Sequence, residues 1–144
     1  MPDIMLLGVE EQVLSLELDE NPADNFPCMP SEGIDSEMRV LLYALLMGIF
    51  FDEAQSLEQL VLEYGPEGPW VFKLDVTITE RLAEVEEDDI DGIALNWSKT
   101  GEMSALNMEA SDLREILARF LFNLVHFCLL VRQEGVLSVF IYSE

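Results

Sequence analysis

The sequence has little positive charge. Seven Lys and Arg residues stand against 29 Asp and Glu residues, giving a formal net charge of −22 over 144 residues. Nucleic acids and anionic lipids carry the same sign, so we expect no direct nucleic-acid binding and no membrane binding. The charge also exceeds the roughly 2 to 8 units that keep a small domain soluble. Solubility alone therefore does not explain it, and a positively charged partner becomes the leading explanation.

The sequence also lacks the residues from which most enzyme sites are built. His126 is the only histidine and lies inside an apolar run, where we expect a buried core residue rather than a general base. The glycines are scattered, without a GxGxxG motif or a P-loop. With 29 acids any carboxylate pair can be chosen, so such pairs carry no signal. We predict no catalytic residue and no cofactor in a non-enzymatic protein, with a carboxylate-dependent enzyme as a weaker alternative.

Cysteine is scarce too. Cys28 and Cys128 lie a hundred positions apart and form no CxxC or metal-type spacing. A disulfide between them stays open, but a chain of this length needs no covalent staple, which favours two reduced thiols. The first residues show no positively charged region followed by an apolar export segment. These features predict a cytoplasmic protein.

No apolar run is long enough to cross a membrane. The two apolar stretches at residues 40–51 and 120–131 cover 12 positions each, whereas a membrane-spanning helix needs about 20. We predict two largely buried helices, packed as neighbours in the domain centre or against a second copy of the chain. Because a helix that is apolar on all sides is hard to cover in so short a chain, a homodimer is a reasonable expectation.

The remaining patterns predict an α+β fold. We expect one domain over residues 1–144, with a small, mostly antiparallel sheet packed with four or five helices. One or two strands are expected within residues 3–18, where apolar residues alternate, with a helix as the open alternative there. Strands are also expected at 70–76 and 136–142, which are rich in β-branched and aromatic side chains. Residues 19–33 contain three prolines and several acids and predict an irregular connection.

Helices are predicted from caps and apolar periodicity. A helix capped by Asp35 or Ser36 should break within residues 48–52, and a second helix should continue to Tyr64. Three later helices are expected at residues 77–85, 90–100 and 107–134. Their predicted capping residues are Thr77 or Thr79, Asp88 or Asp89, and Asn107 or Ser111.

The most unusual stretch is EVEEDDIDG at residues 84–92, which holds six acids and no cation. The acids are Glu84, Glu86, Glu87, Asp88, Asp89 and Asp91. Part of the pattern resembles an EF-hand loop with Gly92 at its sixth position, but the twelfth position is Ser98, where a bidentate Glu belongs. We therefore predict no specific metal site. Helix capping needs only one of these acids and leaves five unexplained.

A dense negative surface is suited to a positive partner, because complementary charge speeds association and penalises wrong partners. Our leading hypothesis is a non-enzymatic acidic protein that binds and occludes a basic protein, in the manner of an immunity protein, an inhibitor or a DNA mimic. The six acids of residues 84–91 are its candidate partner-binding residues. The main alternative is a dimeric adaptor or secretion-chaperone-like protein, which would bind through an apolar groove left exposed on residues 40–51 and 120–131.

Overall fold

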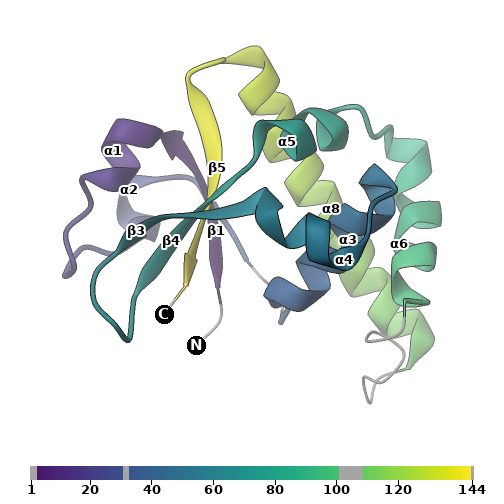
Figure 1. Ribbon diagram of the computed structural model, residues 1–144. Helices are drawn as coiled ribbons and strands as arrows, with labels where there is room; N and C mark the ends of the chain where they lie inside the picture. Colours follow the sequence, from purple (N-terminus) through teal and green to yellow (C-terminus); the bar gives the residue numbers. More distant parts are fainter. Residues whose placement is uncertain (1–2, 31–32, 101–108, 144) are drawn as a thin grey trace.

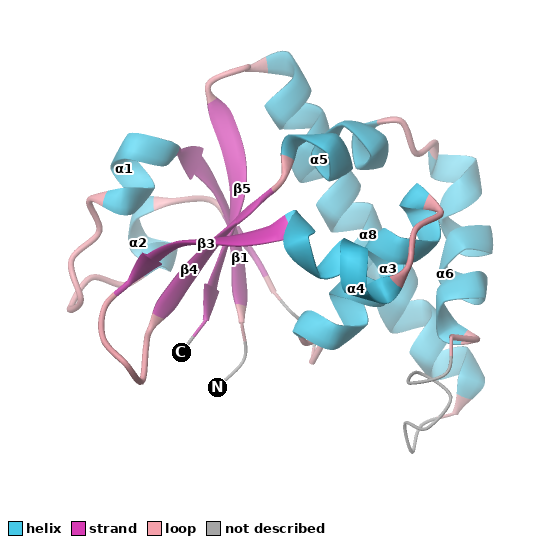
Figure 2. Cartoon of the chain, in the orientation of Figure 1, coloured by secondary structure: helices cyan, strands magenta, loops and turns pink. Residues whose placement is uncertain are grey.

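A five-stranded antiparallel sheet lies beside a layer of helices (Figures 1 and 2). The computed structural model describes residues 3–30, 33–100 and 109–143. These residues contain seven α-helices, four of them with eight or more residues and three with four or five. The predicted α+β fold in a single domain is confirmed.

The sheet brings the two ends of the chain together. Its strands lie in the order β2-β1-β5-β4-β3, and every neighbouring pair is antiparallel. Their bounds are Ile4–Val9 for β1, Cys28–Met29 for β2, Glu58–Glu63 for β3, Trp70–Leu74 for β4 and Leu137–Ser143 for β5. Strand β5 is the central strand of the sheet, and its apolar residues are covered on both faces.

Side chains alternate between two apolar layers, as the period of a strand requires. Toward the main helical layer the strands present Met5, Leu7, Leu74, Val139 and Ile141. Toward the opposite face they present Leu6, Val71, Phe140 and Tyr142. The short helices α1 (Glu10–Leu14) and α2 (Pro22–Asn25) lie on that opposite side (Figure 1).

The main helical layer is built around the longest helix, α8 (Ala110–Gln133). It packs against α5 (Val76–Ala83), α6 (Ile90–Ser98) and β5. Trp97 of α6 is fully buried, and its indole Nε1 donates a hydrogen bond to the Met38 carbonyl at 2.9 Å. This bond ties α6 to α3 (Ser36–Met47).

Two segments differ from the expected elements. The alternating residues 13–18 form no strand: Val13 and Leu14 end helix α1, and residues 15–18 are a turn and irregular backbone in which Leu16 is buried. The expected helix to Tyr64 ends early: α4 (Phe51–Ala54) leads into a 3₁₀ turn (Gln55–Leu57), and β3 follows. Pairing with β4 supplies the backbone partners of β3, and a bulge between Leu60 and Leu62 accommodates its unbroken apolar run.

The connection at 19–33 is only partly irregular, since it contains α2 and the short strand β2. Among the predicted caps, Asp35 is confirmed, because its carboxylate accepts a hydrogen bond from the Met38 amide. Asp75, rather than either threonine, caps α5. Asp89 and Glu109 occupy the N-cap positions of α6 and α8 without a side-chain capping bond. Ser111 lies inside α8, and Asn107 is outside the described residues.

The two apolar runs are largely covered within one subunit. Residues 40–51 lie in α3 and its junction with α4, and residues 120–131 lie in α8. Most side chains of both runs are buried or half-buried in one core. The exposed apolar side chains on these runs are Leu45, Phe50, Phe122 and Leu130. In the described part of the chain, no single helix is long and apolar enough to span a membrane. The bent pair Ser36–Met47 and Phe51–Leu57 meets that test only when its two pieces are joined.

Candidate functional site

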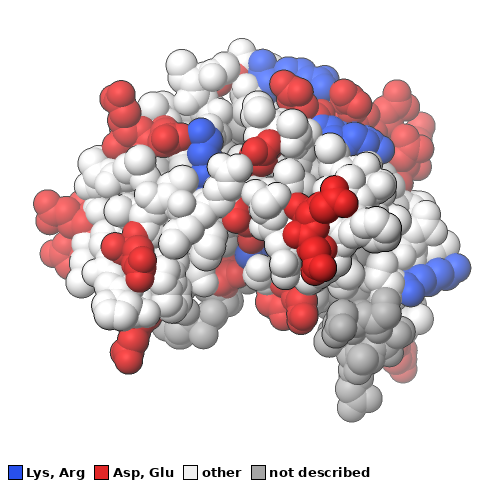
Figure 3. Space-filling view, in the orientation of Figure 1, with Lys and Arg blue, Asp and Glu red and all other residues white. Residues whose placement is uncertain are grey.

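The six predicted partner-binding acids lie together on the connection between α5 and α6. Glu84 is the C-cap of α5, Glu87–Asp89 form a 3₁₀ turn, and Asp91 is in the first turn of α6. All six residues are exposed. Carboxylates gather over this region in the space-filling view (Figure 3). We call residues 84–91 the acidic segment.

The acidic segment borders a shallow hollow of about 360 Å³. Glu84, Asp88 and Asp89 line it together with Arg81, whose Nε donates a 3.3 Å hydrogen bond to the Leu46 carbonyl on α3. None of the ion pairs between described residues includes one of the six acids. The six carboxylates are therefore exposed and without a direct ion pair among the described residues, although Arg81 borders the same hollow.

Lys73 and Arg39 pair with acids in other parts of the fold. Lys73 of β4 pairs with Glu10 of α1 on the sheet face opposite the main helical layer. Arg39 of α3 is 1% exposed and forms a bidentate pair with Glu58 of β3, at 2.8 Å from Nε and 3.1 Å from the second amino nitrogen. Pairing of Arg39 inside the fold leaves less positive charge to offset the acids on the surface.

Arg39 is the centre of a buried polar network. Its first amino nitrogen lies 2.9 Å from an Asp3 carboxylate oxygen, and Tyr43 donates a 2.6 Å hydrogen bond to Glu58. Burial opposes the charged guanidinium, but the hydrogen bonds and charge of Glu58 outweigh it and raise the pKa of Arg39. Burial is also the main reason that the pKa of Tyr43 lies well above its ordinary value. The network is internally satisfied, so we assign it a structural role.

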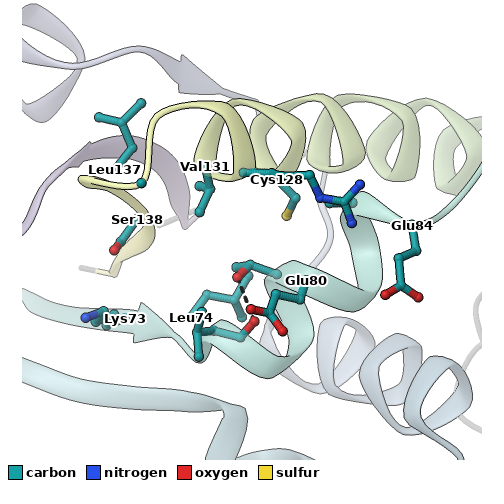
Figure 4. A pocket seen from close by; sticks show the side chains of 13 residues that line it. Lys73, Leu74, Glu80, Glu84, Cys128, Val131, Leu137 and Ser138 are labelled. Atoms are coloured by element: carbon teal, nitrogen blue, oxygen red, sulfur yellow. Dashed lines mark hydrogen bonds between the residues drawn. The ribbon is translucent and has the colours of Figure 1, made fainter.

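A larger cavity lies beside the acidic segment, and the sequence did not predict it. It has a volume of about 440 Å³ and lies between α5, the last turns of α8 and the adjoining ends of β4 and β5. Figure 4 shows Cys128 and Val131 pointing from α8 toward α5, with Leu74 on the near strand. Its charged lining residues are Glu80 of α5, Glu84 at the C-cap of α5, Lys73 of β4 and Arg132 of α8. We call this space the α5–α8 cavity.

The α5–α8 cavity offers poor chemistry for nucleophilic catalysis. Burial raises the pKa of the Cys128 thiol to about 12, so the thiol stays protonated at neutral pH. Thr79 uses its hydroxyl to donate a hydrogen bond to the Val76 carbonyl. No histidine is among the described lining residues. Its combination of apolar walls and a few charges is typical of a binding site.

His126 is not the buried core residue that its surroundings in the sequence predicted. It is exposed, its Nδ1 lies 2.8 Å from the Phe122 carbonyl, and its ring packs 4.3 Å from that of Phe122. Residues 119, 122, 126 and 130 form the outer stripe of α8, which a period of 3.6 places away from the core. His126 and Cys128 are two positions apart and so point to different sides of the helix.

The spacing of the acids does not form an EF-hand loop, since residues 90–98 are helical. Within the described ranges, no group of three or more His, Cys, Asp or Glu side chains is arranged to hold a metal ion. No family model, curated protein or solved structure matches the chain.

Proposed function

We propose that this chain is a non-enzymatic acidic protein that binds and occludes a basic protein partner. One observation carries the proposal: all six carboxylates of the acidic segment are exposed and outside the ion pairs of the described residues. Such a surface opposes the compact state by self-repulsion, which a bound cationic partner would relieve. Immunity proteins, inhibitors and DNA mimics are the classes that fit this behaviour. The six acids are the proposed contact residues.

Three further predictions belong to the same proposal. The partner is a protein rather than nucleic acid or a membrane, because both of the latter share the chain's sign. A cytoplasmic location accords with two free cysteines, Cys28 and Cys128. A homodimer stays a prediction, for which light scattering across a concentration series is the direct measurement. Phe50, 80% exposed at the junction of α3 and α4, is the first position at which to disrupt a dimer.

The adaptor or secretion-chaperone alternative is weaker. It needs a continuous apolar groove on the two apolar runs, and most of that surface is packed into the core of one subunit. What remains exposed is a few separate side chains on α3 and α8, which is ordinary for a protein surface. The carboxylate-dependent enzyme is also weaker, because the two carboxylates that line the α5–α8 cavity, Glu80 and Glu84, lie on one wall and do not face each other across it.

A capture experiment with matched variants tests the proposal. The first variant replaces all six acids of the acidic segment with Asn or Gln. The control neutralises six other exposed acids and so changes the net charge by the same amount. The control positions are Glu11, Glu17, Asp19, Glu63, Glu67 and Glu134.

Immobilised wild type, variant and control are incubated with source-cell lysate at low salt, and bound proteins are eluted by a salt step. We expect wild type and control to retain the same basic protein and the variant to lose most of it. Equal recovery by all three would refute the assignment of the acidic segment. Release only by detergent or denaturant would favour an apolar groove instead.

A further inference from the structure

The α5–α8 cavity has a buried floor and an apolar mouth. Leu74 and Cys128 on the floor are each 1% exposed. At the mouth, Val76 is 59% exposed, and Val136, which lies between two lining residues, is 69% exposed. Exposed valines at the entrance of a well-formed cavity are suited to an aliphatic group that inserts from outside.

The charge at the cavity is unusual for the end of a helix. Glu80 and Glu84 lie four residues apart at the C-terminal end of α5, where the helix dipole favours cations over carboxylates. No ion pair between described residues includes either carboxylate. Arg132 lies in the last turn of α8, where its charge complements that helix's own dipole. Lys73 also lines the cavity but is paired with Glu10, and Arg81 in the last turn of α5 lines the neighbouring hollow instead. The α5 wall of the cavity therefore carries two carboxylates that are outside the ion pairs of the described residues.

The α5–α8 cavity adjoins the acidic segment. Glu84 lines both the cavity and the shallow hollow that contains Asp88 and Asp89. A partner attracted by the acidic segment is therefore already at the mouth of the cavity. In interfaces of this kind, surface charge governs the rate of association, and a side chain buried in a pocket governs the rate of dissociation.

We propose that the α5–α8 cavity binds a lysine side chain of the basic partner. The methylene stem would lie against Val131 and Leu74, and the ammonium would lie between Glu80 and Glu84. A long stem with a compact charge suits a site with apolar walls and acids along one side. This inference rests on the proposed function, because it names the anchoring group of the same partner.

Alkyl probes test the cavity without the partner. The folded chain is titrated with butylammonium, hexylammonium and hexanoate, and the methyl NMR signals of Val76 and Val131 report binding. We expect hexylammonium to bind at least tenfold more tightly than hexanoate. Each added methylene should strengthen binding about fourfold if the stem is buried. Equal or tighter binding of hexanoate would overturn the proposal and indicate a site for fatty acids. An absence of shifts at both valines would also overturn the proposal.

Two matched variants locate the charge that matters. Glu80→Gln lies in the cavity but outside the acidic segment, whereas Asp91→Asn lies in the acidic segment but outside the cavity lining. We expect Glu80→Gln to weaken hexylammonium binding at least threefold and Asp91→Asn to leave it unchanged. Equal effects of the two would overturn the cavity assignment.

The two proposals can fail separately. Failure of the wild type to capture any basic protein, with hexylammonium binding intact, would refute the proposed function and leave an alkylammonium site. Capture that depends on the acidic segment, without probe binding in the cavity, would refute only the lysine inference.

Discussion

Replacing Arg39 should remove a large part of this protein's free energy of unfolding. Arg39→Met keeps the aliphatic stem but removes the guanidinium that bridges Glu58 and Asp3. The Glu58 side chain is 6% exposed, so its charge would be left with the Tyr43 hydroxyl and little water. Breaking one partner out of a buried ion pair typically costs about 3–5 kcal/mol. Domains of this size have a total free energy of unfolding of about 5–15 kcal/mol, so the loss should be easily measured.

Urea denaturation followed by circular dichroism measures this loss. With a slope of about 2 kcal/mol per molar urea, the midpoint of Arg39→Met should fall by about 2 M. The double variant Arg39→Met/Glu58→Gln removes the Arg39 and Glu58 charges, and it should recover much of the loss because only Asp3, the more exposed of the two carboxylates, is left without its partner. A midpoint shift below about 0.5 M in the single variant, or a double variant no better than the single one, would refute this account of the network.

Three further predictions concern other parts of the fold. Cys128, with its pKa raised to about 12 by burial, should resist thiol reagents at pH 8 until the protein is unfolded; rapid labelling of a Cys28→Ser variant would contradict its placement. Asp75 caps α5, and the hydrogen bonds from Thr77 lower its pKa, so it contributes stability above its unfolded pKa that is lost as pH falls through the folded value. Asp75→Ala should therefore cost about 1 kcal/mol at pH 7 and less below about pH 4, and an equal loss at both pH values in chemical denaturation would argue against the cap. Neutralising the acidic segment should raise the thermal midpoint in low salt, with a smaller gain in 1 M salt; a gain independent of salt would show that the acids do not repel one another.

The sequence predicted what depends on local pattern. Strands β4 and β5, the break after Met47, and the exposed acidic segment follow from composition and caps that act within a few residues. Residues 58–63 were predicted to be helical but form strand β3. Their apolar spacing fits either structure, and β4 supplies the hydrogen-bond partners that favour the strand. Tertiary pairing decided that segment.

The candidate site was half predictable for the same reason. Glu80 and Glu84 share a helix face by spacing, as do Cys128, Val131 and Arg132, so each wall of the α5–α8 cavity was visible in the sequence. That the two walls meet depends on how α5 packs against α8, which no local pattern encodes. His126 shows the opposite error, since apolar neighbours in sequence suggested burial and the helical period placed it outside.

In the proposed function, the acidic segment guides a basic partner onto this surface. Stopped-flow association of the captured partner with wild type, the six-acid variant and the charge-matched control, over a range of ionic strength, tests it most directly. The account predicts an association rate for wild type and control that falls steeply with salt, and a slower, flatter rate for the six-acid variant. Identical rates and salt slopes for the six-acid variant and the control would contradict it.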